Sequence, residues 1–180
     1  NGSSLLLAGI KLCAYLRWSD WATVKEDYDL FLVRWNGSSW ETVARSEDSQ
    51  NGGPGQTPTE RACATTSGEA AEYALVIQRR DASQNVHFEL LVTGASELQA
   101  FVYARSLPNL ADAPAIFKVS AVWCSSPYGQ EPYSSEGPTN GLGGSASGGF
   151  PKPDVAAYDG VTTSVYPEFC GTSASAPHVA

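Results

Sequence analysis

The sequence has few basic residues, two histidines and no methionine. Its 180 residues contain 11 Lys and Arg against 19 Asp and Glu, which gives a formal net charge of -8. Proteins that bind nucleic acid or an anionic membrane through charge need the opposite balance, so we expect neither partner. No basic cluster exists beyond Arg79-Arg80. No apolar run approaches the ~20 residues that cross a bilayer.

Cysteine is also scarce, and its spacing argues against a zinc site. None of the four cysteines forms the C-x-x-C pair that is typical of structural zinc. An even number in an acidic chain rich in Ser, Gly and Thr is compatible with two disulfides and an oxidising compartment. It is equally compatible with buried free thiols. The sequence therefore leaves the pairing of these residues open: Cys13, Cys63, Cys124 and Cys170.

The composition excludes a disordered chain, because 42% of the residues are apolar and only 17% are charged. The length suits one ordinary domain or two small ones. The chain begins at Asn1 and ends at Ala180 within an apolar run, so we expect both ends to be truncated. The absence of a signal peptide then excludes no compartment.

Residues 1–105 read as strands and turns. Apolar and polar residues alternate with a period of two in several segments, which indicates strands with one buried face. Asn36-Gly37 supplies a tight-turn signal, and 48–59 is a Gly- and Pro-rich loop. This part predicts an antiparallel, jelly-roll-like β-sandwich. The expected strands cover residues 12–18, 29–35, 40–45, 73–78, 86–92 and 98–103.

The pattern changes over residues 106–180. A strand over 116–122 and a short strand over 154–157 precede a turn at Asp159-Gly160, and a helix is expected to begin at Ser173. Strand, loop and helix in this order predict an incomplete α/β domain. The Gly-rich segment 141–149 lacks the Lys-Ser/Thr ending of a phosphate loop, and we interpret it as a surface loop.

Ser173 lies where a helix should start, and this position suits a nucleophile. The positive end of the helix dipole and an unpaired backbone N–H would both face the oxyanion that forms in acyl transfer. Gly171 leaves space for a substrate backbone, and Pro177 falls near the limit at which a helix tolerates proline. The alternative, which this physics alone favours, is that Thr172 or Ser173 simply caps the helix.

Residues 171–180, read as GTSASAPHVA, closely resemble the nucleophile motif of the subtilisin-like serine peptidases. Three earlier segments resemble landmarks of that family in the same order: 117–122 its Val-Gly-Ala-Val strand, 133–138 its Ser-Ser-x-Gly-Pro turn, and 152–157 its Lys-Pro-Asp segment. Two residues depart from the pattern. Cys170 replaces the usual Asn or small residue, and Tyr158 replaces a proline. Residues 1–105 are similar to the pre-peptidase C-terminal type of β-sandwich, here inserted within the catalytic domain.

This resemblance implies a fragment of a secreted serine endopeptidase that acts on proteins or peptides without a cofactor. Ser173 would be the catalytic nucleophile, and its backbone N–H would bind the oxyanion. Gly171, Thr172 and Pro177 would shape the motif. The catalytic Asp and His and the oxyanion Asn would lie upstream in the same domain, so the isolated chain should be inactive. His178 would be structural, and His87 should lie on a solvated sheet face.

Three other hypotheses remain at this stage. Asp27 and Asp29 share one face of a strand and are compatible with a structural calcium ion, although solvated carboxylates are the simpler interpretation. An esterase is disfavoured by the motif spacing, because Ser175 stands where the nucleophile elbow of α/β-hydrolases needs glycine. A catalytically dead relative with a binding or adhesion sandwich is the main alternative. Its binding surface would be aromatic and formed by four tryptophans, Trp18, Trp21, Trp35 and Trp40. Packing of these tryptophans in the sandwich core is the simpler interpretation.

Overall fold

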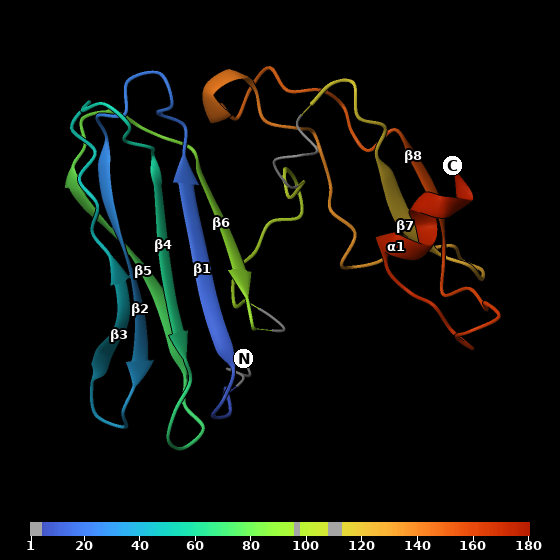
Figure 1. Ribbon diagram of the computed structural model, residues 1–180, viewed down its shortest axis with the longest axis horizontal. Coiled ribbons are helices and arrows are strands. Elements are labelled where there is room, and N and C mark those ends of the chain that lie inside the picture. Colours follow the sequence, from blue (N-terminus) through green and yellow to red (C-terminus); the bar gives the residue numbers. More distant parts are fainter. Residues whose placement is uncertain (1–4, 96–97, 108–112) are drawn as a thin grey trace. The chain divides into compact units, whose positions relative to one another are not determined.

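The computed structural model describes residues 5–95, 98–107 and 113–180, and these form two compact units (Figure 1). The first unit comprises Asn1–Ala100 and the second Phe101–Ala180. No helix in the described ranges is long and apolar enough to span a membrane.

The first unit consists of two three-stranded antiparallel sheets, with strand orders β4-β1-β6 and β3-β2-β5 (Figure 1). Contacts of β4 with β2 and β3 join the sheets face to face, which is consistent with the expected β-sandwich. The strands are β1 Lys11–Trp18, β2 Asp27–Trp35, β3 Trp40–Ser46, β4 Thr59–Thr65, β5 Tyr73–Asp81 and β6 Phe88–Thr93.

The core of the first unit follows from the period of two. Alternate residues of β1 and β2 face inward and are almost fully buried. Trp18 lies among them, 1% exposed, with its ring 5.5 Å from that of Tyr28 and its indole N–H donating to the Glu26 carbonyl. For Trp18 the core role is therefore confirmed. The central members of this core are Leu12, Ala14, Leu16, Trp18, Tyr28, Leu30 and Leu32.

A disulfide joins the first sheet. Cys13 on β1 and Cys63 on β4 are directly opposed in the antiparallel register, and their sulfurs are bonded. Cys124 and Cys170 are free thiols. The sequence was compatible with two disulfides or with free thiols, and the structure has one disulfide and two free thiols, because Cys13 and Cys63 face each other on paired strands.

Two expectations for the first hundred residues need correction. The strand expected over 98–103 is absent, since Phe101 and Val102 are 58% and 75% exposed and no strand pairs with them. His87 precedes β6 and is half-buried, so it is not on a solvated sheet face. Its backbone N–H donates to the Ser19 hydroxyl, which holds the approach to the strand. Local alternation cannot reveal whether a partner strand exists.

The second unit contains a parallel pair of strands and a short helix. β7 Val119–Trp123 and β8 Val155–Asp159 run side by side, with Trp123 paired to Asp159 at their carboxyl ends. The helix α1 Thr172–Ser175 packs against both strands. It continues as a 3-10 turn, η3 Ala176–His178, so the longer helix expected from Ser173 is interrupted near Pro177, which has no N–H to donate. A further 3-10 turn, η2, covers Leu142–Gly144.

Candidate functional site

Ser173 lies in the first turn of α1 and faces solvent. Thr172 and Ser173 are exposed, whereas Ala174 and Ser175 are 3% and 0% exposed. The two buried residues form the face of α1 that packs on β7 and β8. No acceptor among the described residues binds the Ser173 N–H. The motif therefore presents one hydroxyl and one backbone donor outward from a helix that is anchored by small residues.

Gly171 precedes this helix in a conformation that only glycine adopts readily. Its φ is 102° and its ψ is 162°. A Cβ at this position would meet nothing closer than the Ser173 nitrogen, at 3.8 Å. The backbone conformation, and not a lack of space, therefore makes glycine necessary here, and the space above Gly171 is open.

The histidine of the motif is bound to its own helix. His178 Nδ1 lies 2.8 Å from the Ala174 carbonyl oxygen, one turn earlier. His178 is the only histidine in the sequence of the second unit. The structural role expected for His178 agrees with this contact, and the second unit supplies no separate imidazole as a base.

A buried carboxylate links the end of β8 to the start of α1. Asp159 is 0% exposed, and its Oδ2 accepts the Gly171 N–H at 2.7 Å. The same oxygen accepts the Tyr133 hydroxyl. Burial, and then this hydrogen bond, raise the pKa of Tyr133 above its ordinary value. Sequence reasoning treated Asp159 only as a turn residue. The sequence signal that could have identified Asp159 is its position, an acidic residue between the expected strand over 154–157 and Gly160.

The residue before the motif is a thiol of low reactivity. Cys170 is exposed and contacts Glu168, with 3.3 Å between Sγ and Oε1. The hydrogen bond to Glu168, burial and the charges of Glu168 and Asp159 raise the pKa of Cys170 to about 11. The thiol is therefore protonated at neutral pH and is a weak nucleophile. Cys124 donates to the Gly160 carbonyl at 3.3 Å.

The other motif segments meet around β7. The Lys118 N–H at the start of this strand donates to the Asp154 carboxylate at 2.7 Å, and the Ala121 N–H donates to the Ser134 hydroxyl at 2.9 Å. Gly137 touches the next segment, because a Cβ there would lie 2.0 Å from the Lys152 carbonyl oxygen. Segments joined by hydrogen bonds across up to 36 residues of sequence thus form one packed unit with α1.

The Gly-rich loop closes on itself. The Thr139 N–H donates to the Phe150 carbonyl at 2.9 Å, and the Phe150 N–H donates back to the Thr139 hydroxyl at 2.8 Å. Within the loop, the Gly141 N–H donates to the Ser145 carbonyl. These contacts fit the expected surface loop and provide no phosphate-binding nest that leads into a helix.

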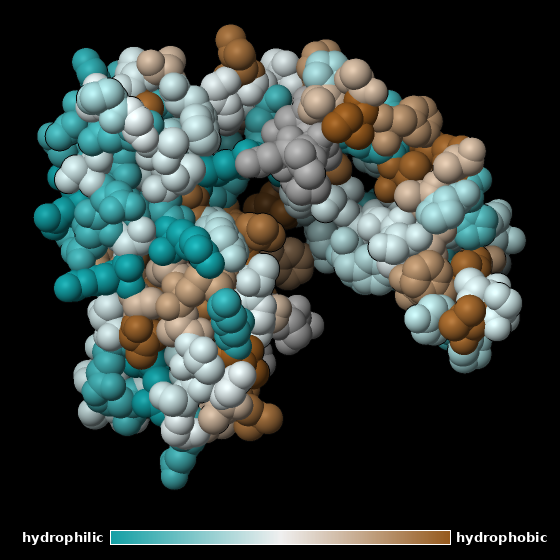
Figure 2. All heavy atoms as spheres, viewed as in Figure 1, coloured by the Kyte–Doolittle hydropathy of each residue, from teal (hydrophilic) through white to brown (hydrophobic). Residues whose placement is uncertain are grey.

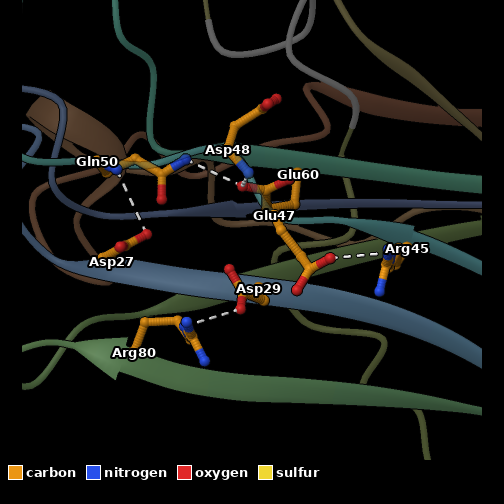
Figure 3. Close-up of polar contacts among 8 residues, drawn as sticks. All are labelled: Asp27, Asp29, Arg45, Glu47, Asp48, Gln50, Glu60 and Arg80. Atoms are coloured by element: carbon orange, nitrogen blue, oxygen red, sulfur yellow. Dashed lines mark hydrogen bonds and ion pairs between the residues drawn. The ribbon is translucent and has the colours of Figure 1, made fainter.

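The carboxylates considered for calcium are bound to protein donors (Figure 3). Asp29 pairs with Arg80 at 3.1 Å, whereas Asp27 accepts the Gln50 backbone N–H at 3.3 Å. Glu60 accepts the Gln50 side-chain amide at 3.0 Å. Within the described ranges, no group of three or more His, Cys, Asp or Glu side chains could hold a metal ion. Calcium binding stays a hypothesis without support from this arrangement.

The tryptophans do not form a single surface. Trp18 is in the core, while Trp21 is 43% exposed. Trp40 is 47% exposed and lies against Trp35, with 5.4 Å between ring centroids. Among these four tryptophans, Trp35 and Trp40 form a ring pair, whereas Trp21 is exposed elsewhere in the sequence.

Comparison with known proteins adds no assignment, because no protein-family model, no curated protein and no solved structure matches the chain.

Proposed function

We propose that the second unit is the nucleophile-bearing part of a subtilisin-like serine endopeptidase that is secreted and uses Ser173 to cleave peptide bonds. The observation that carries this proposal is the pairing of an exposed Ser173 hydroxyl with an unpartnered Ser173 N–H, within the described residues, on a helix anchored to a parallel strand pair. A hydrolytic serine needs both groups to face the same substrate carbonyl.

In the proposed reaction, Ser173 Oγ attacks the peptide carbonyl carbon while a histidine takes the hydroxyl proton. The Ser173 N–H and a side-chain amide stabilise the tetrahedral oxyanion. The histidine then protonates the leaving amine, and water hydrolyses the acyl-enzyme. His178 contacts the Ala174 carbonyl and is not the base. We propose that the base, its carboxylate partner and the amide come from residues outside this sequence.

The test compares the 180-residue chain with the whole protein encoded by its gene. The isolated chain should hydrolyse casein no faster than buffer, whereas the whole protein should cleave it and bind a fluorophosphonate covalently. Ser173→Ala should abolish labelling, and the loss seen in subtilisin on removal of its serine, about a millionfold in turnover, sets the expected scale. Ser164→Ala is the matched control, because Ser164 is also exposed in this unit.

Two results would contradict the proposal. Ser173-dependent cleavage by the isolated chain would show that no outside residues are needed. A whole protein that carries the Asp and His but gives no Ser173-dependent labelling would exclude the peptidase itself.

A second candidate is a catalytically dead relative whose sandwich binds a protein or glycan. The Trp35–Trp40 pair favours it, because exposed aromatic rings are common recognition elements. Sequencing of the coding region upstream separates the two candidates. An Asp and a His in the motifs of the family support the peptidase, and other residues at those positions support the binding protein.

A further inference from the structure

We infer that Asp159 is a positioning residue for Ser173, which holds the backbone of Gly171 and thereby fixes the start of the nucleophile helix. This inference rests on the proposed function for its catalytic meaning. The hydrogen bonds on which it depends belong to the fold itself.

The geometry places Asp159 where a side-chain hydrogen bond joins the end of β8 to the residue that precedes α1. Asp159 ends β8, is fully buried, and binds the Gly171 N–H two residues before Ser173. A charged acceptor makes such a bond roughly twice as strong as a neutral one. The N–H of Gly171 is therefore held in place by a buried carboxyl group.

Tyr133 supports the carboxylate from the other side. Its hydroxyl donates to the same Oδ2 that binds Gly171, so one oxygen is fixed by two donors from separate segments. Burial, and then the hydrogen bond to Asp159, raise the pKa of Tyr133, so its hydroxyl keeps its proton and remains a donor. Burial of a carboxylate is costly without such donors, and these two offset part of the cost.

The hydrogen bond between Asp159 and Gly171 adds to a backbone bridge within the segment that joins β8 to Gly171. Val161 and Phe169 form a two-way backbone bridge, at 3.2 and 2.8 Å, which closes the loop between them. The bridge ends two residues before Gly171. Gly171 has a φ of 102° and no side chain of its own that could fix its position by packing. Asp159 restrains Gly171, which with Cys170 joins the closed loop to α1.

A purely structural role makes a different prediction. If Asp159 only stabilises the unit, its replacement lowers the unfolding temperature and leaves local geometry intact until the unit melts. If it positions Ser173, the folded protein shows a local change at Gly171 and Ser173, and a neutral acceptor restores part of the native behaviour. Amide exchange measured by NMR on the 180-residue chain separates the two roles.

We expect Asp159→Ala to accelerate exchange of the Gly171 amide by about tenfold or more, the scale of one lost hydrogen bond to a charged group. Asp159→Asn keeps an acceptor and should accelerate exchange only about threefold. Tyr128→Phe is the control variant with Asp159 unchanged, because Tyr128 is 54% exposed and its ring lies against that of Tyr158. Unchanged Gly171 exchange in the folded Asp159 variants would overturn the inference. Should Asp159→Ala not fold, Asp159→Asn alone decides.

The same variants in the whole protein test the consequence for Ser173. We expect fluorophosphonate labelling to slow at least tenfold in Asp159→Ala, to recover partly in Asp159→Asn, and to keep its native rate in Tyr128→Phe. Equal labelling of all variants would overturn the positioning role. A wild-type protein without any labelling would instead contradict the proposed function, while the exchange result at Gly171 would stand independently.

Discussion

Both units bury polar side chains, but among the described residues only the first has a core of large apolar side chains. The first unit has an apolar core in which Leu16, Trp18 and Leu30 are at most 2% exposed. In the described part of the second unit, the fully buried side chains are mostly polar, with Asp159, Thr139 and Ser175 at most 1% exposed. Large apolar side chains of the second unit reach solvent, such as Phe117 at 63%. Figure 2 shows hydrophobic residues at the surface of both units.

This difference predicts how each unit responds to a single substitution. An apolar core is stabilised by burial of area, which depends little on the identity of each neighbour. A unit held by buried hydrogen bonds depends on each donor and acceptor, and a single loss leaves a polar group unsatisfied. We therefore expect single polar replacements to cost more in the second unit than exchanges between apolar core residues of similar size cost in the first.

The largest expected effect is the loss of the disulfide in the first unit. The Cys13–Cys63 bridge spans a sequence separation of 50, and loop-closure entropy assigns it about 4 kcal/mol of stability. The double replacement of Cys13 and Cys63 by Ala should lower the free energy of unfolding of the first unit by that amount in urea titrations. Replacement of Cys124 and Cys170 by Ala is the matched control, and we expect well under ~1 kcal/mol there. Equal losses of unfolding free energy in the two double variants would contradict the predicted difference between the disulfide and the free cysteines.

A smaller effect is expected at a glycine of the second unit. Gly160 has φ +67°, and a Cβ there would lie 2.2 Å from the Trp123 ring. Gly160→Ala should cost about 2–3 kcal/mol, because it adds an overpacked contact to a left-handed backbone. Gly143→Ala is the control, since Gly143 has φ +68° and open space around it, and it should cost about 1 kcal/mol. Thermal unfolding followed by calorimetry measures both, and similar costs would show that packing on Trp123 contributes nothing.

The smallest effect concerns acid stability in the first unit. Donation from the Gln84 N–H, helped by Ser83, holds the pKa of Glu26 below its ordinary value of 4.5. A lowered folded pKa stabilises the protein above that value, and this contribution is lost as the pH falls below about 4.5. Glu26→Gln should therefore flatten the fall in melting temperature between about pH 5 and 3.

Glu60 provides the opposite sign in the same unit. Burial raises its pKa, so protonation favours the folded state and stability increases as the pH falls towards the ordinary glutamate value. Glu60→Gln should make the acid-induced fall in melting temperature steeper. Parallel shifts in the two variants would contradict the assigned directions.

Much of the first unit follows from its sequence pattern. The expected strands at 12–18, 29–35 and 40–45 agree with β1, β2 and β3 to within two residues. Alternation reports which face is buried, and this is a local property. The strand β4 was not expected, and the strand expected at 98–103 does not form. Both errors concern pairing, which depends on residues far away in the sequence.

The sequence likewise predicts some residues of the candidate site and not others. Ser173 and Gly171 stand out in the sequence because a rigid ten-residue motif carries them. Asp159 and Tyr133 do not, since neither has a distinctive local pattern and the two are 26 residues apart. The register of β7 and β8 and the position of α1 bring them to one hydrogen-bonded point.

The sequence by itself determined the alternating strands, the turn residues and the serine motif, because each is encoded within a few neighbouring residues. Only the tertiary structure decided which cysteines pair, that the tryptophans are divided between core and surface, and that a buried carboxyl group binds the backbone of Gly171 before α1. These properties arise from contacts between distant segments, and burial changes the chemistry of a side chain only after those segments have met.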